Sequence, residues 1–211
     1  GHGQFALAYG GQITLPETPD PPDRREGIDV DMDASGRALA LTRDTRDGER
    51  NAVLWWMHDH AVDGEGYAWA WSELPFDKPI ALAYDEIDAR VAVLHEFGGV
   101  YRVTRYELDG ADAVEVSAVD LPGGLWPGDL AAVAGTSFVA ATDRTTWDDV
   151  ILTLDPSGDV EDREDIASVA AISLDLLPLP YDPQVYETSY LWAVGHHDGQ
   201  ALHRYELVPE L

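Results

Sequence analysis

A short apolar phrase occurs four times in this 211-residue chain, at a spacing of about fifty residues. Its copies begin at Arg37, Arg90, Ser137 and Tyr190, and each has the length of a β-strand and ends in polar residues. A period of this size, carried by strands, is typical of proteins built from one repeated β-sheet unit. The repeat therefore predicts an all-β architecture, but it does not by itself identify a function.

Each copy of the phrase lies between two further apolar segments of strand length. The preceding segments are 28–33, 80–85, 130–134 and 169–175, and the following segments are 52–57, 100–108, 150–154 and 201–207. A fourth strand is predicted in the first three units, at 67–71, 113–119 and 160–166. The connectors are rich in Asp, Ser, Pro and Gly, which favour tight turns over helix starts.

The last unit has only three strands before the chain ends, whereas one extra strand, residues 4–15, precedes the first unit. This strand and two of the fourth strands end in the same dipeptide, at Leu15-Pro16, Leu74-Pro75 and Leu121-Pro122. We therefore expect residues 4–15 to pair with 201–207 and to tie a ring of four sheets shut, which leaves only short outer edges. A domain-swapped dimer with eight sheets is the alternative closure.

In this pattern the chain resembles the β-propeller superfamily, and the resemblance covers nearly all of it. It implies one all-β domain, a four-bladed β-propeller of four-stranded blades, at 28–74, 79–121, 129–166 and 169–211 plus 4–15. The architectural relatives it implies are four-bladed, hemopexin-like propellers. Hemopexin domains usually tie their ends with a disulfide, and this chain has no cysteine. No Trp-Asp signature or kelch glycine pair is present, so the resemblance implies no site residues. A β-sandwich of similar strand count is the alternative fold.

The net charge of the chain limits which classes of partner it can bind. Forty acidic residues stand against thirteen basic ones, giving a formal net charge of −27, and Lys78 is the only lysine. This charge repels polyphosphate and predicts no binding to nucleic acid. An acidic excess with little lysine is typical of proteins kept soluble in high salt, and a GC-rich genome produces the same bias. We expect a monomer that is secreted, displayed on a cell surface or cytoplasmic in a salt-adapted organism.

No stretch of eighteen apolar residues exists, so no membrane span is predicted.

Two acids interrupt the repeat: Asp29 and Asp31 occupy the positions that Ala81 and Ala83 fill in the second unit. Such local breaks favour functional sites. Because the inner strands would line the central channel, these carboxylates are expected either to be two solvated acids at its mouth or to hold a divalent cation there.

The predicted topology sorts the loops into two faces. The face that carries the links between sheets, called the blade-link face below, holds seven basic residues: Arg24, Arg25, Arg43, Arg46, Arg50, Lys78 and Arg144. It also holds two tryptophans in loops, Trp126 and Trp147, and the pair His196–His197. The opposite face, which includes a long connection at 175–188, is strongly acidic and, by these boundaries, has no Lys or Arg.

This contrast predicts a binding site on the blade-link face, formed by Arg43, Arg144, Trp126, Trp147, His196 and His197. Arginine pairs with carboxylates or sulfates in a planar fork, and exposed tryptophan offers a flat surface. The favoured function is a non-catalytic binding module, adapted to high salt, for an acidic protein segment or an anionic glycan. The alternative is a metal-assisted hydrolase or lyase with its site at the propeller axis. No Gly-x-Ser-x-Gly, phosphate loop or His-Glu-x-x-His motif supports an enzyme.

Overall fold

The structure is a computed structural model that describes residues 15–33, 37–58, 68–110, 112–157, 159–166, 171–179, 182–194 and 202–207. In the last three strands it describes the backbone and the side chain of Leu191. Every regular element in these residues is a β-strand, as the repeat predicts. None of the described segments forms an apolar helix of membrane-spanning length.

The strands form four antiparallel sheets, each a meander of strands consecutive in the chain. The first sheet contains β1 (Arg24–Met32), β2 (Ala38–Arg46), β3 (Glu49–His58) and β4 (Ala68–Leu74). The second contains β5 (Lys78–Asp85), β6 (Arg90–Phe97), β7 (Val100–Asp109) and β8 (Asp112–Asp120). The third contains β9 (Leu125–Val133), β10 (Thr136–Asp143), β11 (Asp149–Leu154) and β12 (Val160–Ile166). The fourth has three described strands, β13 (Ala171–Leu179), β14 (Asp182–Val194) and β15 (Leu202–Leu207).

Tight hairpins explain why the chain folds into such compact meanders. Asp47–Gly48, Gly98–Gly99 and Ala134–Gly135 each connect two strands with two residues, and all six residues have positive φ. Two positive φ values define the hairpin turn whose twist matches that of the flanking strands. At Gly135 a side chain would also be crowded, because an added Cβ would lie 3.0 Å from Asp88 Oδ2.

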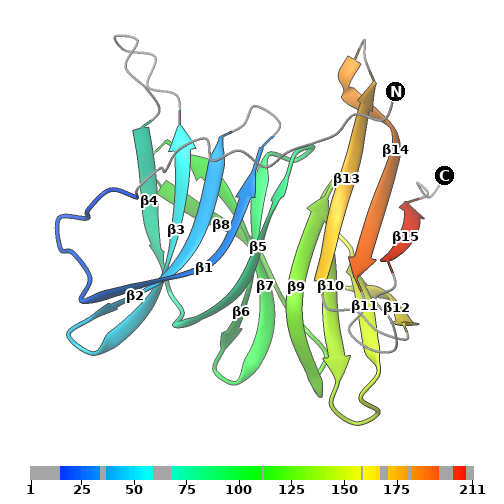
Figure 1. Ribbon diagram of the computed structural model, residues 1–211, viewed down its shortest axis with the longest axis horizontal. Coiled ribbons are helices and arrows are strands. Elements are labelled where there is room, and N and C mark those ends of the chain that lie inside the picture. Colours follow the sequence, from blue (N-terminus) through cyan, green and yellow to red (C-terminus); the bar gives the residue numbers. More distant parts are fainter. Residues whose placement is uncertain are drawn as a thin grey trace.

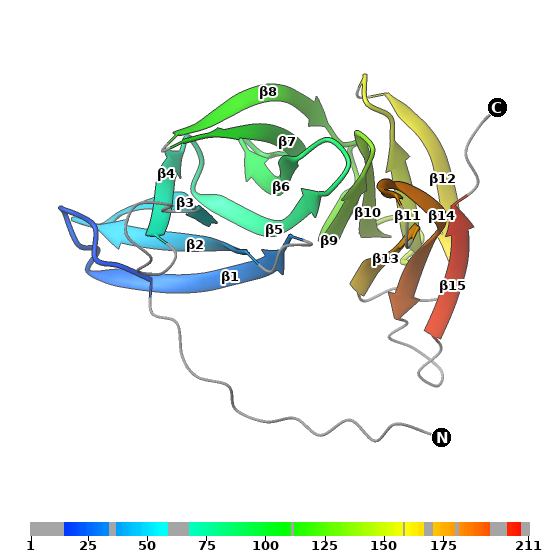
Figure 2. The ribbon, with the colours of Figure 1, turned by 90° about the horizontal axis from the view of Figure 1, so that it is seen from above.

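The four sheets lie in chain order, with their first strands β1, β5, β9 and β13 side by side and their later strands splayed outward (Figures 1 and 2). This is a propeller-like arrangement of repeated sheets. Among the described residues it forms an arc, with β1 at one end and β13 at the other. The predicted closing strand, residues 4–15, lies outside the described residues, so closure of the ring stays a prediction.

The fourth sheet corrects one expectation. The sequence predicts a long connection at 175–188, but β13 and β14 extend into this stretch and leave only two residues between them. Pro178 lies in β13 at an irregularity of the pairing, where the register shifts on both sides of it. Bulges tolerate a residue without an N–H, which is why the prolines do not end these strands.

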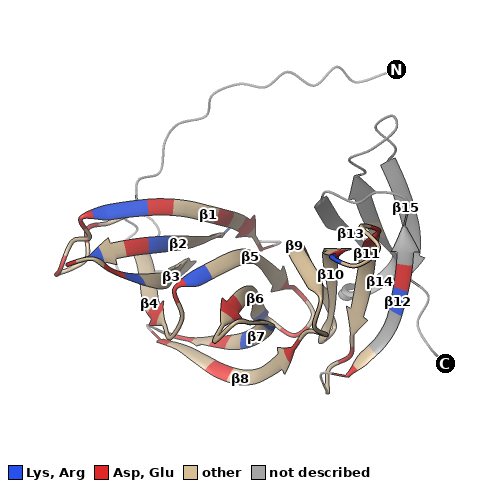
Figure 3. Cartoon of the chain, turned by 90° about the horizontal axis from the view of Figure 1, so that it is seen from below, with Lys and Arg blue, Asp and Glu red and all other residues tan. Residues whose placement is uncertain are grey.

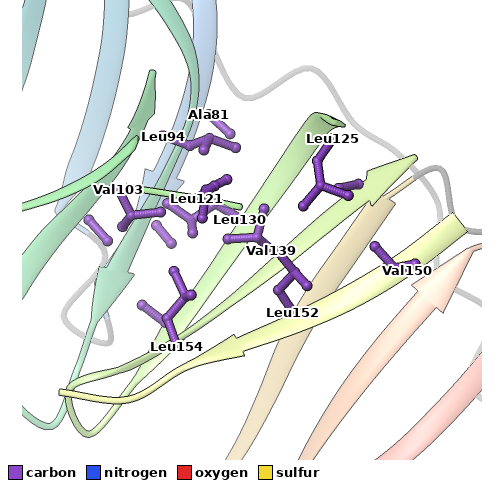
Figure 4. Packing of buried hydrophobic residues seen from close by; sticks show 14 residues of the cluster. Ala81, Leu94, Val103, Leu121, Leu125, Leu130, Val139, Val150, Leu152 and Leu154 are labelled. Atoms are coloured by element: carbon purple, nitrogen blue, oxygen red, sulfur yellow. The ribbon is translucent and has the colours of Figure 1, made fainter. Parts of the chain in front are cut away.

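Two apolar clusters hold adjacent sheets together. One joins the first sheet to the second and includes Leu41, Leu54, Trp56, Leu82 and Tyr106. The other joins the second sheet to the third and includes Leu94, Val103, Leu130, Val139 and Leu152 (Figure 4). Burying a side chain of this size contributes about 1.5–3 kcal/mol. The junctions between these sheets are therefore firmly packed, and they fix where the loops at the sheet ends meet.

Candidate functional site

The end of the third sheet brings together three of the predicted binding residues. Trp126 is the second residue of β9, and Arg144 and Trp147 lie in the turn between β10 and β11. The two indole rings meet edge to face, with centroids 5.5 Å apart and planes at 67°. The guanidinium carbon of Arg144 lies 4.8 Å from the centre of the Trp126 ring, a cation–π distance.

Tyr101 completes this cluster and was not predicted. Its hydroxyl accepts a hydrogen bond from Nη2 of Arg144 at 3.2 Å, and its ring centre lies 5.8 Å from the guanidinium carbon. Tyr101 lies on β7, so the site bridges the second and third sheets. The only sequence signal was its place two residues after the Gly98–Gly99 turn, on the blade-link face. We call Tyr101, Trp126, Arg144 and Trp147 the aromatic–arginine cluster.

The backbone of Trp147 is unusual. Its φ of 63° lies in the left-handed region, which is disfavoured for a bulky side chain. The Trp147 N–H donates to the carbonyl of Asp143 at 2.8 Å, which holds the turn in this conformation. Strained backbone of this kind persists only where surrounding contacts determine it, and it is concentrated at functional sites.

Those surrounding contacts are present. One carboxylate oxygen of Asp143 accepts the N–H of Thr145 at 2.8 Å, and the other accepts Nη2 of Arg163 at 2.8 Å. The hydrogen bond from Arg163, followed by that from Thr145, lowers the pKa of Asp143 below its usual value. The N–H of Arg144 donates to the carbonyl of Gly124 at 2.8 Å, which ties the turn to the link between the second and third sheets. The turn is therefore preorganised.

The cluster is open to solvent and retains a free positive charge. Trp147 is 67% exposed and Trp126 is 46% exposed. In the part of the chain that the structure describes, no carboxylate lies within 4.0 Å of the Arg144 guanidinium. Most other basic residues of the blade-link face are paired with acids, in the pairs Arg25–Asp44, Arg43–Glu26, Arg46–Glu73 and Lys78–Glu96. Figure 3 shows this pattern, with basic residues beside acidic ones along the strands.

Arg43 is not part of the cluster. It lies on β2 in the first sheet, directly opposite Glu26 of β1, and its Nε and Nη2 donate to that carboxylate. This hydrogen bonding lowers the pKa of Glu26. The remaining predicted binding residues, His196 and His197, lie outside the described residues.

The charge contrast between the two faces is smaller than the sequence boundaries implied. Arg37, just before β2, and Arg90, the first residue of β6, lie at the acidic face and bond there to acids, Asp33 and Glu107 respectively. Arg105 reaches the same end of the molecule and donates to the carbonyl of Asp155 at 3.3 Å. What distinguishes the blade-link face is therefore the geometry of the cluster and Arg144, which has no carboxylate partner among the described residues.

Asp29 and Asp31 connect the first sheet to the second. Their Oδ2 atoms accept backbone N–H groups of β5, from Leu82 at 2.8 Å and Tyr84 at 2.7 Å. Their Oδ1 atoms accept the N–H groups of the residues that follow them in β1. Burial raises the pKa of Asp31 above its usual value. Among the described residues no group of three or more His, Asp or Glu side chains could hold a metal ion. The cation site at Asp29 and Asp31 stays a prediction.

The fold defines an all-β protein of repeated antiparallel sheets with an exposed aromatic–arginine cluster at one sheet junction. No protein-family model and no curated protein matches the chain. A solved structure that is similar to it is a luciferin-regenerating enzyme, with 15% sequence identity and a TM-score of 0.44. The match covers 81% of this chain and 53% of that one, so the chain spans about half the length of that structure.

Proposed function

We propose that this protein is a non-catalytic binding module and that its ligand contacts the aromatic–arginine cluster. The observation that carries the proposal is the conformation of Trp147, whose indole is mostly exposed on a left-handed backbone beside an arginine without a described carboxylate partner. Left-handed backbone and exposed apolar surface both cost free energy in the unliganded protein. A ligand that covers the two indoles would offset that cost.

The cluster combines a group that can bind an anion, the Arg144 guanidinium, with the apolar surface of the indole rings beside it. The Arg144 guanidinium lies against the Trp126 ring, and its Nη2 already bonds to Tyr101, so its remaining N–H groups are available to a carboxylate or sulfate. The exposed indoles can pack against the apolar face of a sugar or a side chain. Trp, Tyr and Arg are also the residue types that dominate binding energy at interfaces. The ligand is an acidic protein segment or an anionic glycan.

The net charge of the protein limits which anionic ligands the cluster can bind. With a formal charge of −27, the protein repels any densely charged polyanion. The cluster offers one arginine, Arg144, beside two exposed indoles, which suits an isolated negative charge next to apolar surface. We therefore expect ligands with sparse carboxylates or sulfates to bind better than polyanions.

The cluster is carried by a scaffold that we propose to be a propeller with four blades per chain. Residues 4–15 would then supply the fourth strand of the last blade. Two features support this: the fourth sheet has three described strands, and residues 4–15 end in the Leu-Pro pair that ends two other fourth strands. A strand there would protect the outer edge of β15, the edge away from β14, with which no described strand pairs.

Replacing Trp126, Arg144 or Trp147 singly by alanine is expected to weaken ligand binding by about 30-fold, because truncating a central aromatic or arginine contact typically costs about 2 kcal/mol. Binding would be measured on an array of uronic-acid and sulfated oligosaccharides and Asp/Glu-containing peptides, followed by titration calorimetry. Arg50→Ala is the matched control, because it removes the same charge from an exposed position in the first sheet. The proposal fails if no probe binds the wild type, or if all three variants bind normally while folded.

We also propose that the acidic composition adapts the protein to high salt. Repulsion among 40 acids should destabilise the fold at low ionic strength, where the Debye length is about 30 Å at 0.01 M, and screening should relieve it as that length falls to about 3 Å at 1 M. If screening recovers about 2 kcal/mol, the melting temperature should rise by about 6 °C. Potassium chloride is the right salt, because sulfate strengthens apolar burial on its own. A melting temperature that does not change between 0.01 and 1 M would leave genome composition as the explanation.

A further inference from the structure

One face of the first sheet is apolar and incompletely covered. Directly opposed residues form a row across its four strands: Val30 of β1, Ala40 of β2, Trp55 of β3 and Trp71 of β4. Leu15 packs on this face, and Arg25 lies 4.4 Å from the centre of the Trp55 ring. The β1 edge has no such cover, since Val30 is 75% exposed and Met32 is 62% exposed. We call this the free face of the first sheet.

The same positions are buried in the next two sheets. Leu82 of β5 and Leu130 of β9 hold the place of Val30 in the repeat, and they are 3% and 4% exposed. Leu82 packs against the first sheet, and Leu130 packs against the second. In both cases this face of a sheet contacts the sheet that precedes it. The free face of the first sheet is therefore a sheet–sheet contact surface that lacks its partner in the described structure.

The protein's own fourth sheet does not lie against this surface. β13 packs beside β9, at the far end of the arc from β1 (Figure 2). Bringing it to β1 would require the intervening junctions to rotate. The two junctions among the first three sheets are held by the two apolar clusters and by carboxylates, since Asp29 and Asp31 bind amides of β5, and Asp85 of β5 binds amides of the third sheet.

We infer that the free face of the first sheet binds the fourth sheet of a second copy of this chain. We call the face of a sheet that contacts the preceding sheet its leading face, and the opposite face, toward the next sheet, its trailing face. Each junction along the arc is then a head-to-tail contact between the leading face of one sheet and the trailing face of the sheet before it. A head-to-tail contact that repeats generates a ring when its rotation closes. Two arcs related by a two-fold axis would form two further junctions of the same kind and a ring of eight sheets, within the range known for propellers. Closure within one chain is the alternative.

The mass in solution tests this inference independently of the proposed ligand. Light scattering on the full chain in 1 M potassium chloride, which screens the charge of the two copies, should give twice the monomer mass of 23.1 kDa. The double variant Val30→Asp/Met32→Asp should raise the dimer dissociation constant at least 100-fold, so that the monomer mass is measured. Because both residues are exposed in a single chain, this variant should keep the wild-type circular dichroism spectrum.

Val114→Asp/Val116→Asp is the matched control. These valines are exposed on β8, the last strand of the second sheet, so the control adds the same charge to another apolar surface and should leave the dimer intact. A wild type of 23.1 kDa, or a dimer that survives Val30→Asp/Met32→Asp, would overturn the inference.

The absence of cysteine allows the orientation of the two copies to be tested as well. Ser173 of β13 holds the place that Ala83 holds in the second sheet, at the trailing face of the repeat. Oxidation of the variant Val30→Cys/Ser173→Cys should therefore link two chains, whereas Val30→Cys alone should not. A link within one chain, no link in the double variant, or a link between two Val30→Cys chains would each contradict the head-to-tail ring.

Discussion

Replacing Asp85 by alanine is expected to lower the free energy of unfolding by about 4 kcal/mol, because four backbone donors, one buried and three partly buried, lose their acceptor together. Asp85 is 3% exposed at the end of β5. Its Oδ1 accepts the N–H groups of Ile87 and Asp88, at 3.0 and 3.1 Å, within its own turn. The same carboxylate accepts the N–H groups of Ala134 at 2.9 Å and Gly135 at 2.7 Å, which belong to the first hairpin turn of the third sheet.

Urea unfolding followed by tryptophan fluorescence would measure this loss as a lower midpoint with an unchanged slope. Asp85→Asn should cost less, because the amide keeps one acceptor oxygen but turns an NH₂ group toward some of the same donors. Asp109→Ala is the matched control, an exposed acid on β7 whose removal should change the free energy by no more than about 0.5 kcal/mol. A loss below about 1 kcal/mol in Asp85→Ala would mean that water replaces the carboxylate and that Asp85 does not hold the junction.

Asp85 and the aromatic–arginine cluster act on the same pair of sheets. Asp85 fastens the second sheet to the third at the acidic face, and the hydrogen bond from Arg144 to Tyr101 joins them at the blade-link face. The apolar cluster around Leu94 and Leu130 fills the space between these two contacts. The distance between Tyr101 and Trp126 is therefore set by a fully packed junction, which is what a preorganised binding site requires.

The strands could be predicted because their signals are local. Apolar runs of strand length and Gly-containing turns recur at one period, and both depend only on neighbouring residues. The errors occurred where a local signal competed with pairing across the sheet. Prolines at 178, 180 and 183 indicated a loop, but β13 and β14 extend through that stretch because the bulge at Pro178 accommodates a residue without an N–H.

The site was harder to predict, because its members meet only through tertiary structure. Trp126, Arg144 and Trp147 could be assigned to one face from loop order alone, but Tyr101 joins them through the packing of two sheets. The role of Arg43 depends on strand register, since it faces Glu26 only in the observed pairing of β1 with β2. The acids at 29 and 31 stood out in the repeat, yet the amides that they bind belong to a different sheet.

His95 should make the protein sensitive to acid, and this is the second large effect that we expect. The side chain is 2% exposed and stacks on Phe76, with ring centroids 3.7 Å apart. Its Nε2 lies 2.8 Å from Thr104 Oγ1, and its buried Nδ1 has no hydrogen-bond partner among the described residues. Burial lowers the pKa of His95 from 6.5 to about 4, since a charged imidazolium would lose its hydration.

The direction of the pH effect follows from which state binds the proton. Between pH 4 and pH 6.5 the unfolded chain has a protonated histidine and the folded protein does not, so stability falls as the pH is lowered through this window. A pKa difference of this size corresponds to a loss of about 3 kcal/mol by pH 4. The falling net charge acts in the opposite direction by reducing repulsion among the acids, so the contribution of His95 must be isolated by a variant.

His95→Phe keeps the stacking on Phe76 but cannot take up the proton. Between pH 7 and pH 4.5 the wild type should therefore lose about 2–3 kcal/mol more of its free energy of unfolding than this variant does. Parallel pH profiles for the two proteins would show that His95 is protonated equally in the folded and unfolded states, which a fully buried imidazole does not permit.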